Sequence, residues 1–204
     1  MPSGAAATTH ILKPAVAGFE AQHLNEHLCL TAARLLGLSA ARTMVETVED
    51  ESAVVVERFD RTRRNGAVIR VHQEDLCQAL SVAPARKYQA DGGPTPAGIA
   101  ELLRSALPAP DAETDVWRFA DALAFNWLIA GTDAHAKNYG LLLAGSDRTR
   151  LVERVIDLAT RTPEAFATAA GAADGGVADL GSDLPGRLVD LVAERCRRCV
   201  AVLH

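Results

Sequence analysis

Four side chains that can take part in chemistry lie close together in the chain: Asp133, His135, Lys137 and Asn138. They fall between two apolar runs, and burying a polar side chain unpaired costs ~2–7 kcal/mol, so each needs a partner or a ligand. In phosphoryl transfer, a loop aspartate accepts the proton of the attacking hydroxyl, and an asparagine five residues later binds magnesium. Asp133 and Asn138 have this spacing. A plain helix C-cap and turn, with His135 and Lys137 on the surface, is the alternative.

The wider segment 126–138, Asn-Trp-Leu-Ile-Ala-Gly-Thr-Asp-Ala-His-Ala-Lys-Asn, resembles the catalytic loop of the HipA-type serine/threonine kinases, the toxin halves of bacterial persistence modules. The resemblance implies an α+β, protein-kinase-like fold with ATP and Mg²⁺ as cofactors. It assigns Asp133 as the general base, His135 and Lys137 as further catalytic residues of the loop, and Asn138 as a metal ligand.

Composition places the chain among ordinary globular proteins. It has 204 residues, 49% of them hydrophobic and 4% aromatic, and a formal net charge of −5. An acidic balance argues against direct nucleic-acid binding, which normally needs a basic excess. No apolar run reaches the ~18 residues of a membrane span, and no secretory pattern opens the chain, so we expect a cytoplasmic protein. Cys196 and Cys199 lie three residues apart in a helical pattern, which favours packing over a zinc site.

A short strand, 11–14, carries Lys13 in an apolar context. Its resemblance to the family's phosphate-side strand implies that Lys13 binds the nucleotide phosphates, although a solvated strand-end lysine is the alternative. The amphipathic run 19–36 predicts a helix that ends at Gly37. Either Glu26, which the resemblance favours, or Glu20 could hold Lys13 in an ion pair from this helix.

Two β-type runs, 43–48 and 53–59, joined by the acidic turn 49–52, predict a hairpin. The following Glu57-Arg-Phe-Asp-Arg61 resembles the family's hinge element, which implies that Glu57 and Phe59 bind adenine. Periodicity alone instead favours Phe59 as a core residue.

The next stretch, 68–84, passes from strand to helix, with Gln73, Glu74 and Asp75 expected at the helix start. The polar loop 85–94 ends in Gly-Gly-Pro, and binding a substrate or holding the large lobe together are equally good interpretations. Helices are predicted at 98–106 and 115–130, the second with an N-cap at Thr114-Asp115. Its buried face is expected to be Trp117, Phe119, Ala120, Leu123 and Trp127.

The family's second magnesium ligand is an aspartate at a strand end, and Asp157 falls near that place. The segment 152–160 also repeats apolar residues at helical spacing. Either Asp157 binds the metal, or an internal deletion has removed the metal strand, and we favour the deletion. The Gly/Asp-rich stretch 171–183 predicts a linker, and 184–203 predicts a closing helix.

We therefore expect a partial small β lobe at 1–60 and a mainly helical large lobe at 61–204, with the catalytic loop at 132–138. The resemblance implies an ATP-dependent serine/threonine protein kinase, the toxin of a toxin–antitoxin module, with a protein substrate and a HipB-like DNA-binding antitoxin. Because the family has further N-terminal strands, we expect a truncated form. The alternative is a catalytically impaired relative that only binds an antitoxin or a second kinase half.

Overall fold

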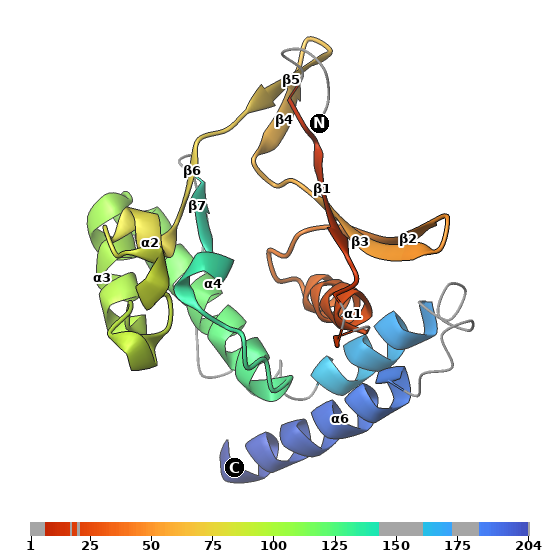
Figure 1. The fold of residues 1–204 in the computed structure, drawn as a ribbon. Coiled ribbons are helices and arrows are strands. Elements are labelled where there is room, and N and C mark those ends of the chain that lie inside the picture. The colour runs from red at the N-terminus through yellow and green to blue at the C-terminus, as the bar shows by residue number, and fades with distance from the viewer. Residues whose placement is uncertain (1–6, 17, 20, 143–160, 173–183, 204) are drawn as a thin grey trace.

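The computed structural model describes residues 7–16, 18–19, 21–142, 161–172 and 184–203. These residues form an α+β fold of small antiparallel sheets and helices (Figure 1). The expected fold class is thereby confirmed. Within this part of the chain, no helix is long and apolar enough to cross a membrane.

The first sheet contains β1 (His10–Pro14), β2 (Thr43–Val48) and β3 (Glu51–Glu57) in the order β1-β3-β2. The predicted strand and hairpin are both present. The hairpin turn is tighter than expected, because β3 already begins at Glu51 and Glu49 takes up a positive φ of 58°. Lys13 lies opposite Val54, which is fully buried, so the lysine lies on the face of the sheet that the protein covers.

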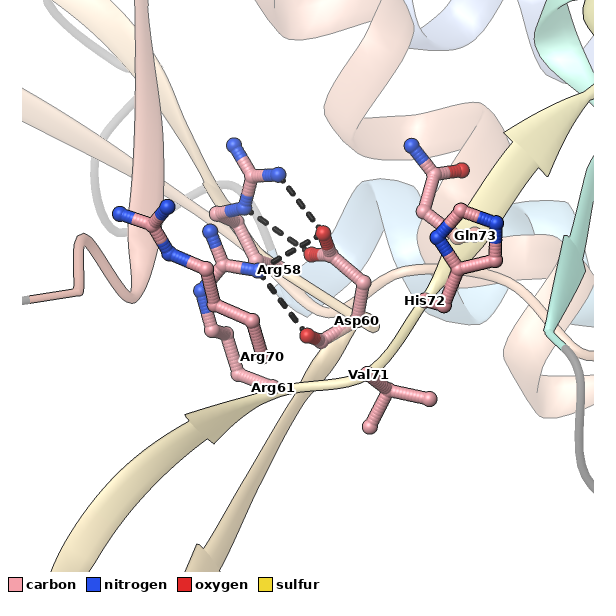
Figure 2. A pocket seen from close by; sticks show the side chains of 7 residues that line it. All are labelled: Arg58, Asp60, Arg61, Arg70, Val71, His72 and Gln73. Carbon is pink, nitrogen blue, oxygen red and sulfur yellow. Dashed lines mark hydrogen bonds and ion pairs between the residues drawn. The ribbon is translucent and has the colours of Figure 1, made fainter.

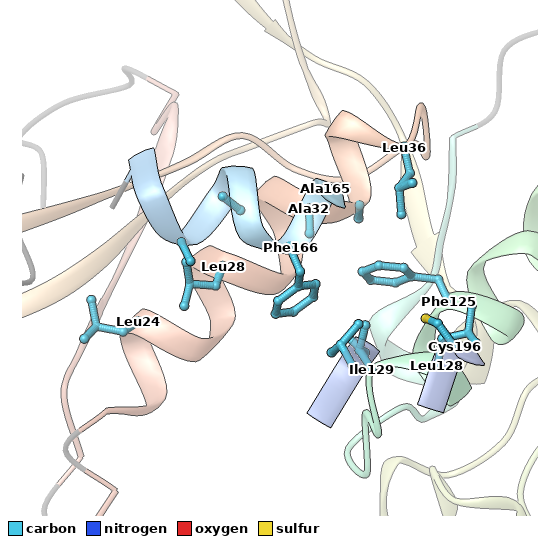
Figure 3. Close-up of a cluster of buried hydrophobic side chains, with 14 residues drawn as sticks. Leu24, Leu28, Ala32, Leu36, Phe125, Leu128, Ile129, Ala165, Phe166 and Cys196 are labelled. Carbon is cyan, nitrogen blue, oxygen red and sulfur yellow. The ribbon is translucent and has the colours of Figure 1, made fainter. Parts of the chain in front are cut away.

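Helix α1 (Gln22–Leu35) packs against β2 and β3 and begins three residues after the predicted start. Its apolar stripe enters a core that also receives the end of α4 (Ala109–Leu128), the helical segment 161–172 and α6 (Leu184–Leu203) (Figure 3). The largest side chains of this core with almost no exposed surface are Phe166, Leu24, Leu28, Leu128 and Val192. The N-terminal helix and the C-terminal helices therefore share one hydrophobic core.

A second hairpin, which the sequence patterns had not indicated, joins β4 (Arg61–Arg64) and β5 (Ala67–Arg70). Its two turn residues, Asn65 and Gly66, have φ angles of 52° and 79°. Positive φ at both positions defines a type I′ turn, for which Asn-Gly is the preferred pair.

The chain then forms β6 (Gln73–Asp75), which pairs with β7 (Gly140–Leu142), and the short helix α2 (Leu76–Ala79). Asp75 caps α2 as expected, because its side chain accepts from the Gln78 amide and the Gln78 side chain accepts from the Asp75 amide. The expectation for Gln73 and Glu74 was wrong. They lie in a strand, because pairing with β7 outweighs the local preference for a helix start.

Two 3₁₀ turns, Pro84–Arg86 and Gln89–Asp91, lead to α3 (Pro96–Ala106), which packs against α4. A second core lies between these elements and α2. It contains Leu76, Cys77, Ile99, Leu103, Val116 and Ala136. This core fixes the base of the segment that follows α4.

Two expectations for α4 were wrong. The helix begins at Ala109 rather than at the predicted 115, and Thr114 lies inside it with its hydroxyl bonded to the Pro110 carbonyl. Proline in a first helical turn loses no hydrogen bond, so the start near Pro110 costs little. Trp127, expected in the buried face, is 56% exposed and lies under the Arg195 guanidinium, 4.9 Å from its centre.

The predicted closing helix is confirmed as α6, and Cys196 is buried in its packing face. Gly171 and Ala172, expected in a linker, are the last residues of the helical segment 161–172. The rest of that linker and the segment 152–160 lie outside the described residues.

Candidate active site

The loop after α4 begins with a sharp reversal of the chain. Ala130 has a positive φ of 56°, and the Gly131 amide donates to the Asn126 carbonyl at 2.7 Å. A Cβ on Gly131 would lie only 3.2 Å from both the carbonyl oxygen and the side-chain oxygen of Asn126. Glycine lets the chain pass close to α4 here, and the loop runs back along the helix toward α2 and β7 (Figure 1).

Asp133 presents its carboxylate to solvent, with 74% of its side chain exposed. The Tyr88 hydroxyl donates a hydrogen bond of 2.6 Å to Asp133 Oδ1, and this bond raises the pKa of Tyr88. His135 Nε2 lies 3.7 Å from the same oxygen. One carboxylate oxygen is therefore held in place, and the other remains available to accept a proton.

His135 is buried, and Lys87 lies next to it. The Lys87 ammonium is 2.9 Å from His135 Nε2, and the Tyr88 ring meets the imidazole edge-on at 5.1 Å between centroids. Because an ammonium can only donate, Nε2 acts as the acceptor and the ring hydrogen belongs on Nδ1. Lys87 therefore occupies His135 Nε2, the nitrogen that would otherwise exchange protons with a substrate. The geometry favours His135 as an anchor of the loop.

Asn138 folds back onto its own loop. Its amide nitrogen Nδ2 donates to the Asp133 backbone carbonyl at 2.6 Å, and its backbone amide donates to the His135 carbonyl at 2.9 Å. The carbonyl acceptor requires the NH₂ group on that side, so Oδ1 points away from the contact. An exposed amide oxygen of this kind is a suitable ligand for a hard cation.

Lys137 makes an ion pair with Asp75 at 2.7 Å, which ties the loop to the N-terminus of α2. The hydrogen bond that Lys137 donates to Asp75 raises the pKa of Lys137, so the ammonium stays charged. The ion pair accounts for Lys137 structurally, and its expected catalytic role stays a prediction.

Lys13 and Glu26 form the ion pair expected from the resemblance, with Nζ and Oε1 2.5 Å apart and 49% and 28% of the two side chains exposed. The competing Glu20 lies outside the described residues. Among the residues described, no hydrogen bond or ion pair joins Lys13 to the loop at 132–138. In Figure 1, β1 and α1 lie on one side of the molecule, and α2 and β7 lie on the other.

Glu57 and Phe59, the expected adenine-binding residues, lie just before β4. Glu57 is 52% exposed, with its carboxylate 3.8 Å from Arg42 Nε. Phe59 is 53% exposed, so the periodicity that favoured a core position was misleading. A Cβ added to Gly140 would come within 3.0 Å of the Phe59 ring, which shows that the ring lies directly over the start of β7. Asp157, the expected second metal ligand, lies outside the described residues.

The site also contains residues that we had not assigned: Lys87, Tyr88 and Asp75. Tyr88 and Lys87 belong to the polar loop 85–94, whose two interpretations had been substrate binding and structural support. Its contacts with Asp133 and His135 show that it supports the catalytic-type loop. The only sequence signal was the polarity of that loop, because the contacts join residues 45 and 48 positions apart.

A small β sheet whose strand lysine pairs with a helix glutamate, together with an Asp-x-x-x-x-Asn loop at the end of a long helix, defines a kinase-like fold. The chain belongs to the HipA-like C-terminal domain family, whose sequence model matches residues 2–173. The expected family is thereby confirmed.

Among curated proteins, the chain is 44% identical over 145 residues to a Sinorhizobium fredii protein named "Putative kinase Y4mE", covering 70% of this chain and 34% of that protein. It is 31% identical over 160 residues to the serine/threonine-protein kinase toxin HipA of Shewanella oneidensis, covering 70% and 35%. The chain thus spans about a third of the length of these relatives.

Among solved structures, the chain resembles one from the Shewanella oneidensis complex of HipA, HipB and operator DNA. The TM-score is 0.69, the identity is 20%, and the match covers 94% of this chain and 58% of that chain. At this identity the likeness establishes the fold.

Proposed function

We propose that this chain is the phosphotransferase part of a HipA-like kinase, which transfers the γ-phosphoryl group of ATP to a serine or threonine of a protein. The observation that carries the proposal is the geometry of the loop. Asp133 is exposed and oriented by Tyr88, and Asn138 is fixed to the same loop with its amide oxygen directed away.

Asp133 acts as the general base in this proposal. The Tyr88 hydroxyl holds Oδ1, so the second oxygen can accept the proton of an incoming hydroxyl group. A base whose orientation is set before the substrate arrives needs no rearrangement in the transition state, and general-base catalysis contributes typically ~10²–10⁴ in rate. The high exposure of Asp133 allows a protein segment to approach it.

Asn138 fits a magnesium ion because it offers an amide oxygen. Asp157 as a second, carboxylate ligand stays a prediction, with the internal deletion as the favoured alternative. Lys13 fits the nucleotide phosphates, since its ammonium lies on a strand and is ordered by Glu26. When bound, Mg²⁺ neutralises charge on the β- and γ-phosphates. We assign adenine binding to Glu57 and Phe59, where the backbone leads from the first sheet into the second hairpin.

The test compares Asp133→Asn with the unchanged chain in two measurements, Mg²⁺-ATP binding by calorimetry and phosphoryl transfer to protein. We expect transfer to fall by ~10²–10⁴ while ATP affinity changes little, because the base acts on the acceptor hydroxyl. Asp115→Asn, which removes a partly exposed carboxylate bonded to Arg118, is the matched control and should change neither. Equal transfer by both variants would exclude Asp133 as the base.

The second candidate function is a catalytically impaired binding module. The observation that favours it is the separation of Lys13 from the catalytic-type loop, because no hydrogen bond or ion pair joins the two among the described residues. Its partner would be a HipB-like antitoxin, by analogy with the complex that contains the structural neighbour. Complex formation with an antitoxin in the absence of any ATP binding would favour this function over the kinase.

The remaining expectations stay predictions. They include the division into lobes at residue 60, the cytoplasmic location, and the absence of direct nucleic-acid binding.

A further inference from the structure

The second hairpin and its flanks are strongly basic. Residues 58–72 contain five arginines (Arg58, Arg61, Arg63, Arg64 and Arg70) and one acidic residue, Asp60, which gives a formal charge of +4 in a chain whose net charge is −5. Five guanidinium groups in fifteen residues repel one another unless negative charge lies nearby. The catalytic-type site described above does not involve these arginines.

The register of the hairpin places two of these charges opposite one another. Arg61 pairs with Arg70 across β4 and β5, so both side chains extend from the same face. Like charges directly opposite in an antiparallel pair destabilise it. The arrangement is favourable only if negative charge lies between or beside the two guanidinium groups.

Asp60 supplies part of that negative charge, and both oxygens of its carboxylate contact arginine side chains. Its carboxylate, 8% exposed, accepts hydrogen bonds from Arg58 Nε at 2.9 Å and from Arg58 Nη2 at 2.7 Å, and it forms an ion pair with Arg61 Nη1 at 2.7 Å. Arg61 also donates through Nε to the Thr8 carbonyl at 2.7 Å. One carboxylate therefore orders two arginines but neutralises only one of them.

The guanidinium of Arg70 makes no hydrogen bond or ion pair with any residue that the structure describes. It lies with the guanidinium groups of Arg58 and Arg61 at one end of a pocket (Figure 2). The pocket has a volume of about 380 Å³, and the others that line it are Asp60, Val71, His72 and Gln73.

We propose that this pocket binds a dianionic phosphate group, with the fork of Arg70 as the direct ligand and with Arg58 and Arg61, ordered by Asp60, supplying the surrounding positive charge. A guanidinium fork matches two oxygens of a phosphate, and a dianion compensates the excess charge that Asp60 leaves. The phosphate group can come from free inorganic phosphate or from a phosphorylated serine or threonine of a peptide. The proposal goes beyond the kinase function and does not depend on it, because no nucleotide takes part.

The test is calorimetry at low ionic strength with three probes: inorganic phosphate, a phosphoserine peptide and the same peptide without phosphate. We expect both phosphate-containing probes to bind and the unmodified peptide not to bind. Stronger binding of the phosphopeptide than of free phosphate would identify the protein-bound group as the source, and equal binding would identify free phosphate.

Three variants distinguish phosphate binding in this pocket from nonspecific attraction of phosphate to the basic hairpin. Arg70→Gln should weaken phosphate binding by about tenfold or more, the loss of a charge-assisted bidentate contact. Arg70→Lys keeps the charge without the fork and should recover only part of the affinity. Arg63→Gln removes the same charge from the same hairpin, but opposite Val68 and away from the pocket, and should change affinity less than about threefold.

The proposal would be overturned by three results. The first is an absence of phosphate binding at millimolar concentration. The second is an equal loss from the Arg63 and Arg70 variants together with tighter binding of duplex DNA, which would indicate a diffuse nucleic-acid surface. The third is a loss of phosphate binding in Lys13→Ala, which would place the phosphate in the proposed nucleotide site. Failure of the kinase proposal would affect only ATP binding and transfer, so the two failures are distinguishable.

Discussion

Replacing Asp60 by asparagine tests whether the hairpin is held to the rest of the fold by one buried carboxylate. The carboxylate is 8% exposed, accepts two hydrogen bonds from Arg58 and forms an ion pair with Arg61; these two arginine side chains are 26% and 9% exposed. An asparagine oxygen can accept only part of this set, and its NH₂ group would face a guanidinium.

Removing one partner of a buried ion pair costs about 3–5 kcal/mol, because a charge is left uncompensated. Here Arg58 is partly hydrated, and Arg61 keeps its bond to the Thr8 carbonyl, so we expect a loss of about 2–4 kcal/mol. For a chain of this size each kcal/mol lowers the melting temperature by about 2–4 °C. Urea unfolding at pH 7 measures the change. Glu113→Gln, which breaks an exposed pair with Arg104, is the control and should leave the unfolding free energy nearly unchanged.

The pH dependence gives an independent check. The hydrogen bond from Arg58 is the main reason that the pKa of Asp60 lies below its usual value. A lowered pKa in the folded state means that the stabilisation is present above the unfolded pKa of about 3.9 and is lost as the pH falls through the folded pKa. The difference in unfolding free energy between the two chains should therefore be constant above about pH 5 and shrink below about pH 4. A difference below about 0.5 kcal/mol at pH 7, or one that stays unchanged down to pH 2, would refute the reasoning.

Three further predictions concern the core and the loop. Phe166→Ala should reduce the unfolding free energy in urea by about 3–5 kcal/mol, because the ring is 1% exposed, whereas Phe19→Ala, at a 68% exposed position, should cost less than about 1 kcal/mol. Tyr88→Phe should lower kcat for phosphoryl transfer by about tenfold at unchanged ATP affinity, since it releases Asp133; an unchanged kcat would contradict a positioning role. Lys137→Gln should lower the melting temperature by only a few degrees, because its ion pair is partly exposed.

Periodicity in the sequence was a good guide where burial is decided locally. The helices α1 and α6 and the first hairpin follow from apolar residues repeating at three and four positions, or in short β-type runs. The same signal failed at Phe59 and Trp127. Trp127 lies under a guanidinium and Phe59 lies over a glycine, and both partners are far away in the chain.

Sequence periodicity did not predict the long-range pairing of β6 with β7. Gln73 and Glu74 read as a helix start because Asp75 caps the helix that follows, yet they pair with Leu142 and Leu141. The sequence of each three-residue strand does not indicate its partner. A strand this short shows too little alternation of apolar and polar residues to distinguish it from a turn. The pairing matters for the site, because β7 follows the loop and β6 ends at Asp75, the partner of Lys137.

The loop itself shows why types and spacing can identify candidate residues without assigning their roles. The four polar residues of the loop lie within six positions of one another, but their contacts differ. They are Asp133, His135, Lys137 and Asn138. Lys137 is paired with the cap of α2, and His135 is in contact with the loop 85–94, so these two side chains hold the segment against the second core. Asn138 is fixed through its nitrogen and Asp133 through one oxygen, and each keeps one oxygen directed outward. An anchored loop that exposes two oxygen ligands is suited to accept a proton and bind a cation, and the anchoring depends on residues about 50 to 60 positions earlier in the sequence.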